Sequence, residues 1–247
     1  MCIRDRSKVA IVGGGAAGMM AAFSAASSGH QVDLFEHNEK LGKKIYITGK
    51  GSCNLTNACD VEDYFGNIVR NSKFLYSAIY TFDNQAVMDF FEEQGLGLKV
   101  ERGNRVFPNS DHASDVIKAL TKALRHVGVK VHLNMDVVEL LADGGRIKGL
   151  KYHNFDTKEM GNTYFCDAVI LAGVGISYPT TGSDGSTWEL CKKLGHTITP
   201  VRPALIGMTA KECYIKELQG LSLKNISFSV LRGKKVLYQE DVYKRQL

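Results

Sequence analysis

The hydrophobic pattern of this chain contains four short apolar runs, and each predicts a buried strand. The runs are bounded by glycine or polar residues and rich in β-branched side chains, as in strands buried on both faces of a parallel sheet. They lie at residues 8–13, 31–36, 129–134 and 167–172. The first two enclose residues 16–28, a helix-compatible segment of small residues that ends before Gly29.

Helical spacing is clear in three further segments. Residues 84–95 repeat apolar positions at helical intervals and end in a glycine. Residues 113–127 predict an amphipathic helix whose apolar face carries Val116, Leu120, Ala123, Leu124 and Val127. Asp184 is placed to cap a helix over residues 184–194, with Gly195 as its stop.

A different pattern, alternation with a period of two, separates the third and fourth apolar runs. Residues 136–142 and 146–153 alternate around the Asp-Gly-Gly turn at 143–145, which indicates a β-hairpin. The aromatic residues at 164–165 indicate a third small strand. This order of elements predicts a doubly wound α/β fold in which a three-stranded antiparallel crossover replaces one helix.

Composition excludes several classes of protein. The 247 residues are 44% hydrophobic and 23% charged, so intrinsic disorder is excluded. The 31 basic and 26 acidic residues give a net charge of +5, without a basic run, so we expect no nucleic-acid partner. The six cysteines form no C-x-x-C pair or zinc pattern, which predicts free thiols in the cytoplasm and no metal site. No apolar run is long enough for a membrane span, and no signal peptide is expected.

The turn after the first run carries the strongest chemical signal. It reads Gly13-Gly14-Gly15-Ala16-Ala17-Gly18, which fits G-x-G-x-x-G. In such a turn Gly13 makes the tight exit from the strand, Gly15 leaves room for a pyrophosphate, and Gly18 lets the helix pack closely on the strand. The N–H groups of the helix start then face the phosphates.

An acidic residue stands at the matching position of the second strand. Glu36 lies 23 residues after Gly13, where a carboxylate accepts both ribose hydroxyls of an adenosine and disfavours a 2′-phosphate, as in NADP. Strand, glycine turn, helix and acid together predict a dinucleotide site. The alternative is a tight turn in an unrelated α/β protein.

The sequence after Glu36 favours FAD over NAD. Residues 42–57 form a polar, glycine-rich stretch around a predicted short strand at Ile45, Tyr46 and Ile47. A nicotinamide dehydrogenase moves promptly into another helix and strand. A long loop here suits a flavin, whose ribitol and ring need further backbone donors.

Four ordered motifs resemble one family of bacterial flavoproteins. The run 48–57 (TGKGSCNLTN) resembles its T-G-G-G-R-C-N-L-T-N signature, and 103–110 (GNRVFPNS) resembles G-R-V-F-P-x-S. Residues 171–183 resemble L-A-T-G-G-x-S-Y-P-x-T-G-S, and Leu194-Gly195-His196 with Pro203-Ala204-Leu205 resembles L-G-H…P-A-L. The family is called BaiN-like or aminoacetone oxidase-like, and the resemblance covers residues 8–235. It implies a non-covalent FAD oxidoreductase.

The chain departs from the family pattern at two places. Ser52 replaces the arginine of the signature, which removes one contact to phosphate or flavin. Residues 172–175 read Ala-Gly-Val-Gly where the family has A-T-G-G, so the backbone near the cofactor is expected to differ.

The resemblance and the motif loops give a set of candidate FAD-binding residues beyond the turn and Glu36. Lys44, with Lys43, is a candidate to offset pyrophosphate charge, against the alternative of a solvated lysine. Asn54 and Thr56 are candidates for hydrogen bonds to flavin or phosphate, against loop capping. The remaining candidates are Val137, which the resemblance places against the adenine, and Ala172 and Gly173 in the loop after the fourth run.

Catalytic residues are not defined by any motif, because the cofactor carries the electrons in flavin chemistry. Two candidates are Arg105, near the flavin ring or an acidic substrate, and Tyr178, as a proton donor or ring contact. The alternatives are a loop-supporting salt bridge for Arg105 and packing for Tyr178. Cys53 is interpreted as a packed thiol and His196 as structural.

The resemblance also predicts the organisation of the chain. We expect an incomplete FAD-binding domain at 7–196, the start of a smaller β-rich substrate domain at 197–240, and non-native tails at 1–6 and 241–247. The β-like segments HTITPV, ISFSVLRG and KKVLYQ fall in the second part. The family's second glycine-rich segment is absent after residue 197, so the chain is expected to be C-terminally truncated and to bind FAD weakly.

The predicted function is therefore that of an N-terminal portion of an FAD-dependent oxidoreductase. Flavin would pass electrons between NAD(P)H or an amine-like donor and an enone-type small molecule or oxygen. Two alternatives are a flavoprotein of tRNA modification and a non-catalytic nucleotide-binding module. The sequence leaves the substrate and the oligomeric state open.

Overall fold

A computed structural model describes residues 6–68, 70–173, 175–202, 209, 211–218 and 221–246. Val174 and the Pro203-Ala204-Leu205 motif lie outside these ranges. The chain divides into two compact units, one ending at Ile198 and the other beginning at Thr199, with Glu101–Asn104 grouped with the second. Each unit is described by itself.

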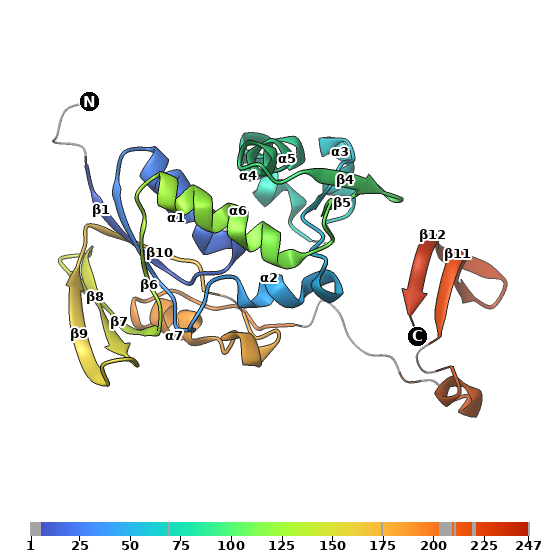
Figure 1. The fold of residues 1–247 in the computed structure, drawn as a ribbon. Helices are drawn as coiled ribbons and strands as arrows, with labels where there is room; N and C mark the ends of the chain where they lie inside the picture. The colour runs from blue at the N-terminus through green and yellow to red at the C-terminus, as the bar shows by residue number, and fades with distance from the viewer. Residues whose placement is uncertain are drawn as a thin grey trace. The chain divides into compact units, whose positions relative to one another are not determined.

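The first unit is built on a four-stranded parallel sheet (Figure 1). Its strands are β1 (Lys8–Val12), β2 (Gln31–Phe35), β6 (Lys130–His132) and β10 (Ala168–Leu171). Their order in space is β10-β1-β2-β6. The chain proceeds from β1 to β2 and β6 on one side and returns to β10 on the other, so the strand order reverses at β1. This topology confirms the predicted doubly wound α/β fold.

One face of the parallel sheet is covered by helices α1 (Ala16–Ser27), α5 (Asn84–Glu93) and α6 (Ala113–His126). Alternate strand residues, Val9 and Ile11 of β1 and Val32 and Leu34 of β2, bury their side chains against these helices. Helices α1 and α6 lie side by side over the sheet (Figure 1). The buried face of α6 carries Val116, Leu120, Ala123 and Leu124, as the sequence predicts.

The other face is covered by a three-stranded antiparallel sheet and by helix α7 (Ser186–Lys193). The sheet consists of β7 (Met135–Asp143), β8 (Arg146–Asn154) and β9 (Glu159–Phe165), in that order. Ala10 of β1 and Phe35 of β2 pack against its buried residues Val137 and Leu150. The predicted antiparallel crossover is therefore present, and the dinucleotide-type sheet lies between two covering layers.

A buried carboxylate joins the crossover sheet to the parallel sheet. Asp33 of β2 accepts hydrogen bonds on its two oxygens from Tyr164 of β9 and from His132 of β6, at 2.5 and 2.7 Å. Phe35 stacks on the His132 ring with centroids 4.8 Å apart. Burial, together with the Asp33 hydrogen bond, raises the pKa of Tyr164 well above its usual value of 10.

Tyr164→Phe is expected to destabilise the fold by about 1–3 kcal/mol near neutral pH, because it removes one donor from the buried Asp33 carboxylate. The same contact predicts a pH dependence. Unfolded Tyr164 ionises near pH 10, whereas the folded residue keeps its proton, so the free energy of unfolding of wild type falls as the pH rises above 10. The difference in free energy of unfolding between wild type and Tyr164→Phe therefore narrows. Urea unfolding at pH 8 and pH 10.5 measures both effects, and the exposed Tyr80→Phe serves as control. A difference in free energy of unfolding that is the same at both pH values would contradict this account.

The remaining elements surround this core. Before residue 110 they are α2 (Lys43–Ile47), β3 (Thr56–Asn57), α3 (Val61–Gly66), α4 (Tyr76–Thr81), β4 (Leu98–Glu101) and β5 (Arg105–Pro108). Strands β3, β5 and β4 form a small sheet in that order, which the sequence did not predict. In the second unit, β11 (Ser222–Arg232) and β12 (Lys235–Gln246) form an antiparallel hairpin. Strand β12 includes residues 241–246, and the proposed domain and tail boundaries stay predictions.

Three local predictions are wrong. Ile45, Tyr46 and Ile47 belong to helix α2 and not to a strand, because Gly42 turns the chain at φ 69° and Ile45 alone among the three packs into the core. Residues 196–201, the HTITPV segment, form no strand. Helix α7 begins at Ser186, with Gly185 at its N-cap; the carboxylate of Asp184 accepts the Ser186 N–H at 2.9 Å without occupying the cap.

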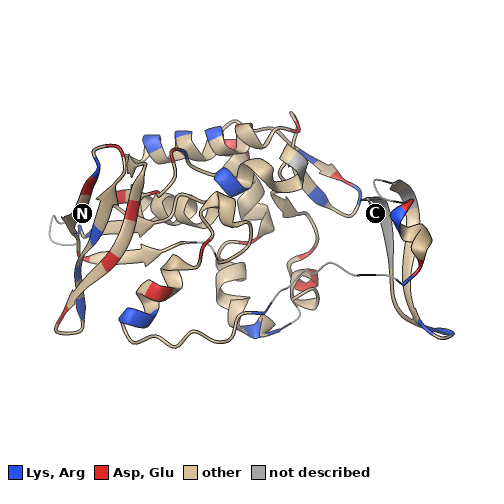
Figure 2. Cartoon of the chain, turned by 90° about the horizontal axis from the view of Figure 1, so that it is seen from below, with Lys and Arg blue, Asp and Glu red and all other residues tan. Residues whose placement is uncertain are grey.

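Charge is mixed over the described surface. Figure 2 shows acidic and basic residues interspersed on the helices and strands. The exposed side of α6 carries Lys118, Lys122 and Arg125, opposite its buried face. No helix in the described ranges is long and apolar enough to cross a membrane. Nor does the described part of the chain gather three His, Cys, Asp or Glu residues into a metal-binding group.

Candidate dinucleotide site

A cleft opens at the carboxyl ends of β1 and β10, where the strand order reverses. Open α/β sheets bind ligands at such a point. The residues that line it come from the ends of β1, β2 and β10, the start of β7, and α2 and α7. They include Val12, Gly13, Gly14, Gly15, Glu36, Lys43, Lys44, Met135, Asp136, Val137, Ala172, Gly173, Thr181 and Ser186. Most of the cofactor candidates predicted from the sequence therefore meet in one cleft.

The glycine turn has the geometry that its spacing predicts. Gly13 has φ 108° and donates its N–H to Phe35 at 2.8 Å, and a Cβ there would lie 2.8 Å from the Ala172 carbonyl oxygen. A Cβ on Gly18 would overlap the carbonyl oxygen of Gly13. These two glycines allow α1, β1 and the chain after β10 to approach closely.

Gly15 differs from the other glycines of the turn, because a Cβ placed on it would meet no protein atom within 4 Å. The space beside it belongs to the cleft, which is the space that a pyrophosphate needs. Gly15 caps α1, whose first turn contains no acidic residue and no side-chain cap. The N–H groups at the start of this helix are therefore available to an anion, and the turn fits a dinucleotide phosphate.

Glu36 lies at the end of β2 and is buried at 8% exposure. One carboxylate oxygen accepts the Gly14 N–H at 2.5 Å, and the other accepts the N–H of Asn38 at 2.8 Å and its side-chain amide at 2.6 Å. The turn and the acid therefore contact each other directly. No sequence motif marks Asn38; its place two residues after Glu36 is the available signal.

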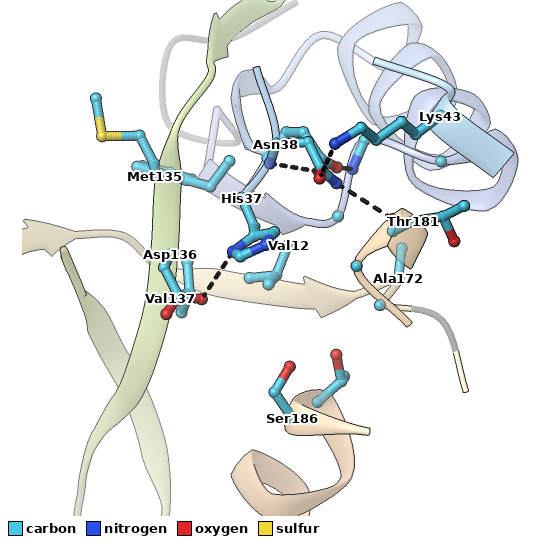
Figure 3. Close-up of a pocket in the computed structure, with 18 of the residues that line it drawn as sticks. Val12, His37, Asn38, Lys43, Met135, Asp136, Val137, Ala172, Thr181 and Ser186 are labelled. Carbon is cyan, nitrogen blue, oxygen red and sulfur yellow. Dashed lines mark hydrogen bonds and ion pairs between the residues drawn. The ribbon is translucent and has the colours of Figure 1, made fainter. Parts of the chain in front are cut away.

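The far side of the cleft is formed by the crossover sheet (Figure 3). Val137 of β7 is buried and lies beside Asp136, whose carboxylate is 3.8 Å from His37 Nδ1. Ala172 and Gly173 follow β10, and Ala172 donates its N–H to Val12 at 2.9 Å. The predicted adenine-side and loop residues are thus placed at this cleft.

A second, largely apolar compartment adjoins the cleft, and the two share Gly15, Lys44 and Ala172. Its lining includes Ala16, Ala17, Met20, Ile45, Cys53, Asn54, Leu55, Phe90, Phe91, Val116 and Leu120. Lys44 thus lies where the polar and apolar parts meet, and partial burial lowers the pKa of its ammonium. Lys43 is turned to the polar side, where it donates to Asn38 and Glu39 at 2.9 and 3.0 Å.

Besides Gly18, three sequence candidates lie outside both linings. Thr56 shares a 2.7 Å hydrogen bond with the Tyr64 hydroxyl. Arg105 of β5 places its guanidinium over the Phe107 ring, 5.7 Å from the centroid. Tyr178 has φ 57° and is 66% exposed. By contrast, Asn54 lines the apolar compartment. The roles proposed for all four stay predictions.

Cys53 packs within the core, and burial raises the pKa of its thiol. Cys166 is also buried with a raised pKa, whereas Cys213 is exposed. Among the described cysteines, we expect N-ethylmaleimide to label Cys213 first and Cys53 and Cys166 at least about tenfold more slowly, because burial disfavours the reactive thiolate and limits access. Peptide mass spectrometry over time measures the order, with labelling in urea as the control. Rapid native labelling of Cys53 would show that it is not packed.

The fold and the cleft define the class of protein. This is a doubly wound α/β domain of the FAD-binding Rossmann type. Its features are a glycine turn where the strand order reverses, a buried acidic residue at the end of β2, and an antiparallel crossover before β10. The chain belongs to the HI0933-like Rossmann domain family, which it matches over residues 7–240.

Similarity to individual proteins supports the same family. The chain is 34% identical over 239 residues to the 3-dehydro-bile acid delta(4,6)-reductase of Clostridium scindens, covering 95% of this chain and 55% of that protein. It is 26% identical over 226 residues to the ribosomal RNA dihydrouridine synthase of Haemophilus influenzae, covering 91% and 54%. The BaiN-like resemblance is confirmed. The chain spans about half the length of these curated relatives.

Solved structures share the fold. The open conformation of a flavocytochrome c3 fumarate reductase has a TM-score of 0.59 at 21% identity, covering 78% of this chain and 41% of that one. A 3-ketosteroid-delta4-(5alpha)-dehydrogenase from Rhodococcus jostii has a TM-score of 0.51 at 16% identity, covering 77% and 54%. At these identities the likeness concerns the fold alone.

Proposed function

We propose that this chain is the FAD-binding part of a cytoplasmic oxidoreductase that reduces a small molecule containing an activated carbon–carbon double bond. The observation that carries the proposal is the continuous lining from Glu36, past the Gly13–Gly18 turn, to the apolar compartment. This lining offers a polar end for an ADP group and an apolar end for a ring system. FAD has this division along its length.

The residues of the chain take separate parts in holding FAD. Glu36 accepts the ribose hydroxyls, the α1 N-terminus and Lys44 face the pyrophosphate, and the backbone at Val137 lies against the adenine. Asn54 and Ala172 border the path toward the ring. FAD supplies the two-electron chemistry when bound, and the chain binds, orients and shields it from water.

The relatives favour a particular reaction class. A bile-acid delta(4,6)-reductase and a dihydrouridine synthase share one chemical step, the addition of hydride to a carbon–carbon double bond conjugated with a carbonyl. An enone-type acceptor fits this step. NAD(P)H is the electron donor that we propose, and an amine-like donor or oxygen as acceptor are the alternatives.

Titration with FAD tests the cofactor directly. The flavin absorbance near 450 nm should shift and saturate at one equivalent, and FMN, which lacks the adenosine monophosphate half of FAD, should bind much more weakly. Anaerobic bleaching by NADH or NADPH, followed by reoxidation with a panel of enones, then tests the reaction. Absence of saturable FAD binding would refute the proposal.

RNA modification is a second candidate, favoured by the similarity to ribosomal RNA dihydrouridine synthases. The mixed surface charge favours a small molecule over RNA (Figure 2). Reoxidation of the reduced flavin by a uracil-containing RNA, and not by small enones, would support this candidate. A nucleotide-binding module without activity would bind FAD but resist reduction by every donor tested.

A further inference from the structure

Asn38 is buried beside Glu36 and has no role in the function proposed above. Its side chain is 9% exposed and lies between the end of β2 and the loop at 178–183 (Figure 3). The amide nitrogen donates to Glu36 at 2.6 Å and to the Thr181 carbonyl at 3.2 Å. The amide oxygen accepts from Lys43 at 2.9 Å.

These contacts fix the orientation of the amide. Both donors and the acceptor of Asn38 are used, and the reverse orientation would place its oxygen against the Glu36 carboxylate and a carbonyl. The loop also approaches closely, since a Cβ on Gly182 would lie 2.9 Å from the Asn38 nitrogen. In the same loop Ser183 is fully buried and shares a 3.3 Å contact with the Thr181 hydroxyl. Asn38 is therefore held on three sides.

The contacts of Asn38 orient the carboxylate of Glu36. One carboxylate oxygen receives two donors from Asn38 and the other receives the Gly14 N–H, so the plane of the carboxylate is set before any ligand arrives. Two hydroxyls of a ribose need both oxygens in a defined plane. Without the Asn38 amide, one backbone donor remains on each oxygen, so two hydrogen bonds in place of three hold the carboxylate and its plane is less firmly set.

We propose that Asn38 is a positioning residue that orients Glu36 for the cis-diol of a ribose, and that it links this recognition to the loop at 178–183. The proposal rests on the dinucleotide function and adds the determinant of its preference for a ribose with free hydroxyls. Asn38 itself contacts Glu36, Lys43 and the loop; the ribose contacts Glu36.

The test compares ADP with 2′,3′-dideoxy-ADP, which lacks both hydroxyls, by calorimetry on the full chain. Wild type should prefer ADP by about tenfold or more, since a hydrogen bond to a charged group contributes about 1.5–3 kcal/mol. In Asn38→Asp, which keeps the shape but donates no hydrogen bond, the preference should fall to about twofold or less. Asn38→Ala, which adds no charge, carries the same expectation.

Asn84→Asp is the matched control. Asn84 is 8% exposed and donates two 2.7 Å hydrogen bonds to the carbonyls of Asn57 and Cys59, away from the cleft. Asn84→Asp, which removes these two hydrogen bonds, should lower thermal stability and leave the preference for ADP over 2′,3′-dideoxy-ADP unchanged. An unchanged preference in the Asn38 variants, a parallel loss of both affinities, or unfolding of both variants overturns the proposal. Failure of wild type to bind FAD or ADP would instead refute the underlying function.

Discussion

Gly15→Val is expected to raise the dissociation constant for FAD by about 100-fold or more while leaving the fold intact. The new side chain starts in open space, because a Cβ on Gly15 has nothing within 4 Å. The backbone at φ −80° and ψ −172° is extended and accepts valine. The side chain instead enters the space beside the α1 N-terminus and keeps the pyrophosphate from its N–H groups. Losing two such bonds costs about 3–6 kcal/mol.

FAD titration and thermal unfolding of the ligand-free protein together measure this result. Gly15→Ala should give an intermediate loss of affinity, and both variants should unfold at the wild-type temperature. Gly66→Ala, at another glycine with open space around it, is the control; it should leave FAD affinity unchanged and add at most about 1 kcal/mol of stability through helix propensity. Full FAD affinity in Gly15→Val would mean that the pyrophosphate lies elsewhere.

Gly18→Ala is expected to have the opposite effect, a loss of about 2 kcal/mol in the free energy of unfolding of the ligand-free protein. Its Cβ would overlap the Gly13 carbonyl oxygen, a backbone atom that no rotamer change can move. Overpacking of this kind costs about 1–3 kcal/mol and sometimes more, against which the better helix propensity of alanine returns about 1 kcal/mol. The steric overlap can be relieved only if α1 moves away from β1.

Urea unfolding without FAD measures this second effect, again beside Gly66→Ala. A shifted midpoint with an unchanged slope indicates lost stability without a change in compactness. Wild-type stability in Gly18→Ala would show that α1 does not lie as close to the turn as the structure places it. The two variants together separate a glycine needed for the ligand from a glycine needed for packing.

The elements with local signals could be predicted from the sequence. The turn at 13–18 and Glu36 follow from spacing within one strand–helix–strand unit, and the crossover sheet follows from alternation around a two-glycine turn. At helix α2 the β-branched residues predict a strand, but packing buries only Ile45 and the segment is helical. Helices α3 and α4 were missed; neither has a buried residue, so the apolar stripe that marks a helix is weak there.

The contacts around Asn38 illustrate what sequence patterns cannot supply. Its bond to Thr181 joins residues 143 positions apart, and no periodicity encodes such a pairing. Likewise Arg105 and Tyr178 stand in conspicuous motifs, yet the first lies over Phe107 and the second is exposed. Motif position identifies a segment, whereas the direction of each side chain depends on the tertiary fold.

The pairing of β10 with β1 has a consequence for biosynthesis. Lys8 and Asp167, which hydrogen-bond where these strands begin, are 159 residues apart. On a ribosome β1 emerges long before β10. At a translation rate of about 5–20 residues per second the delay is roughly 10–30 s. During that interval one edge of β1 is unpaired, and the phosphate-binding turn lacks the Ala172 backbone against which Gly13 packs. A nascent chain therefore gains the complete cleft only after β10 has emerged, and chaperones have that interval in which to bind the open edge.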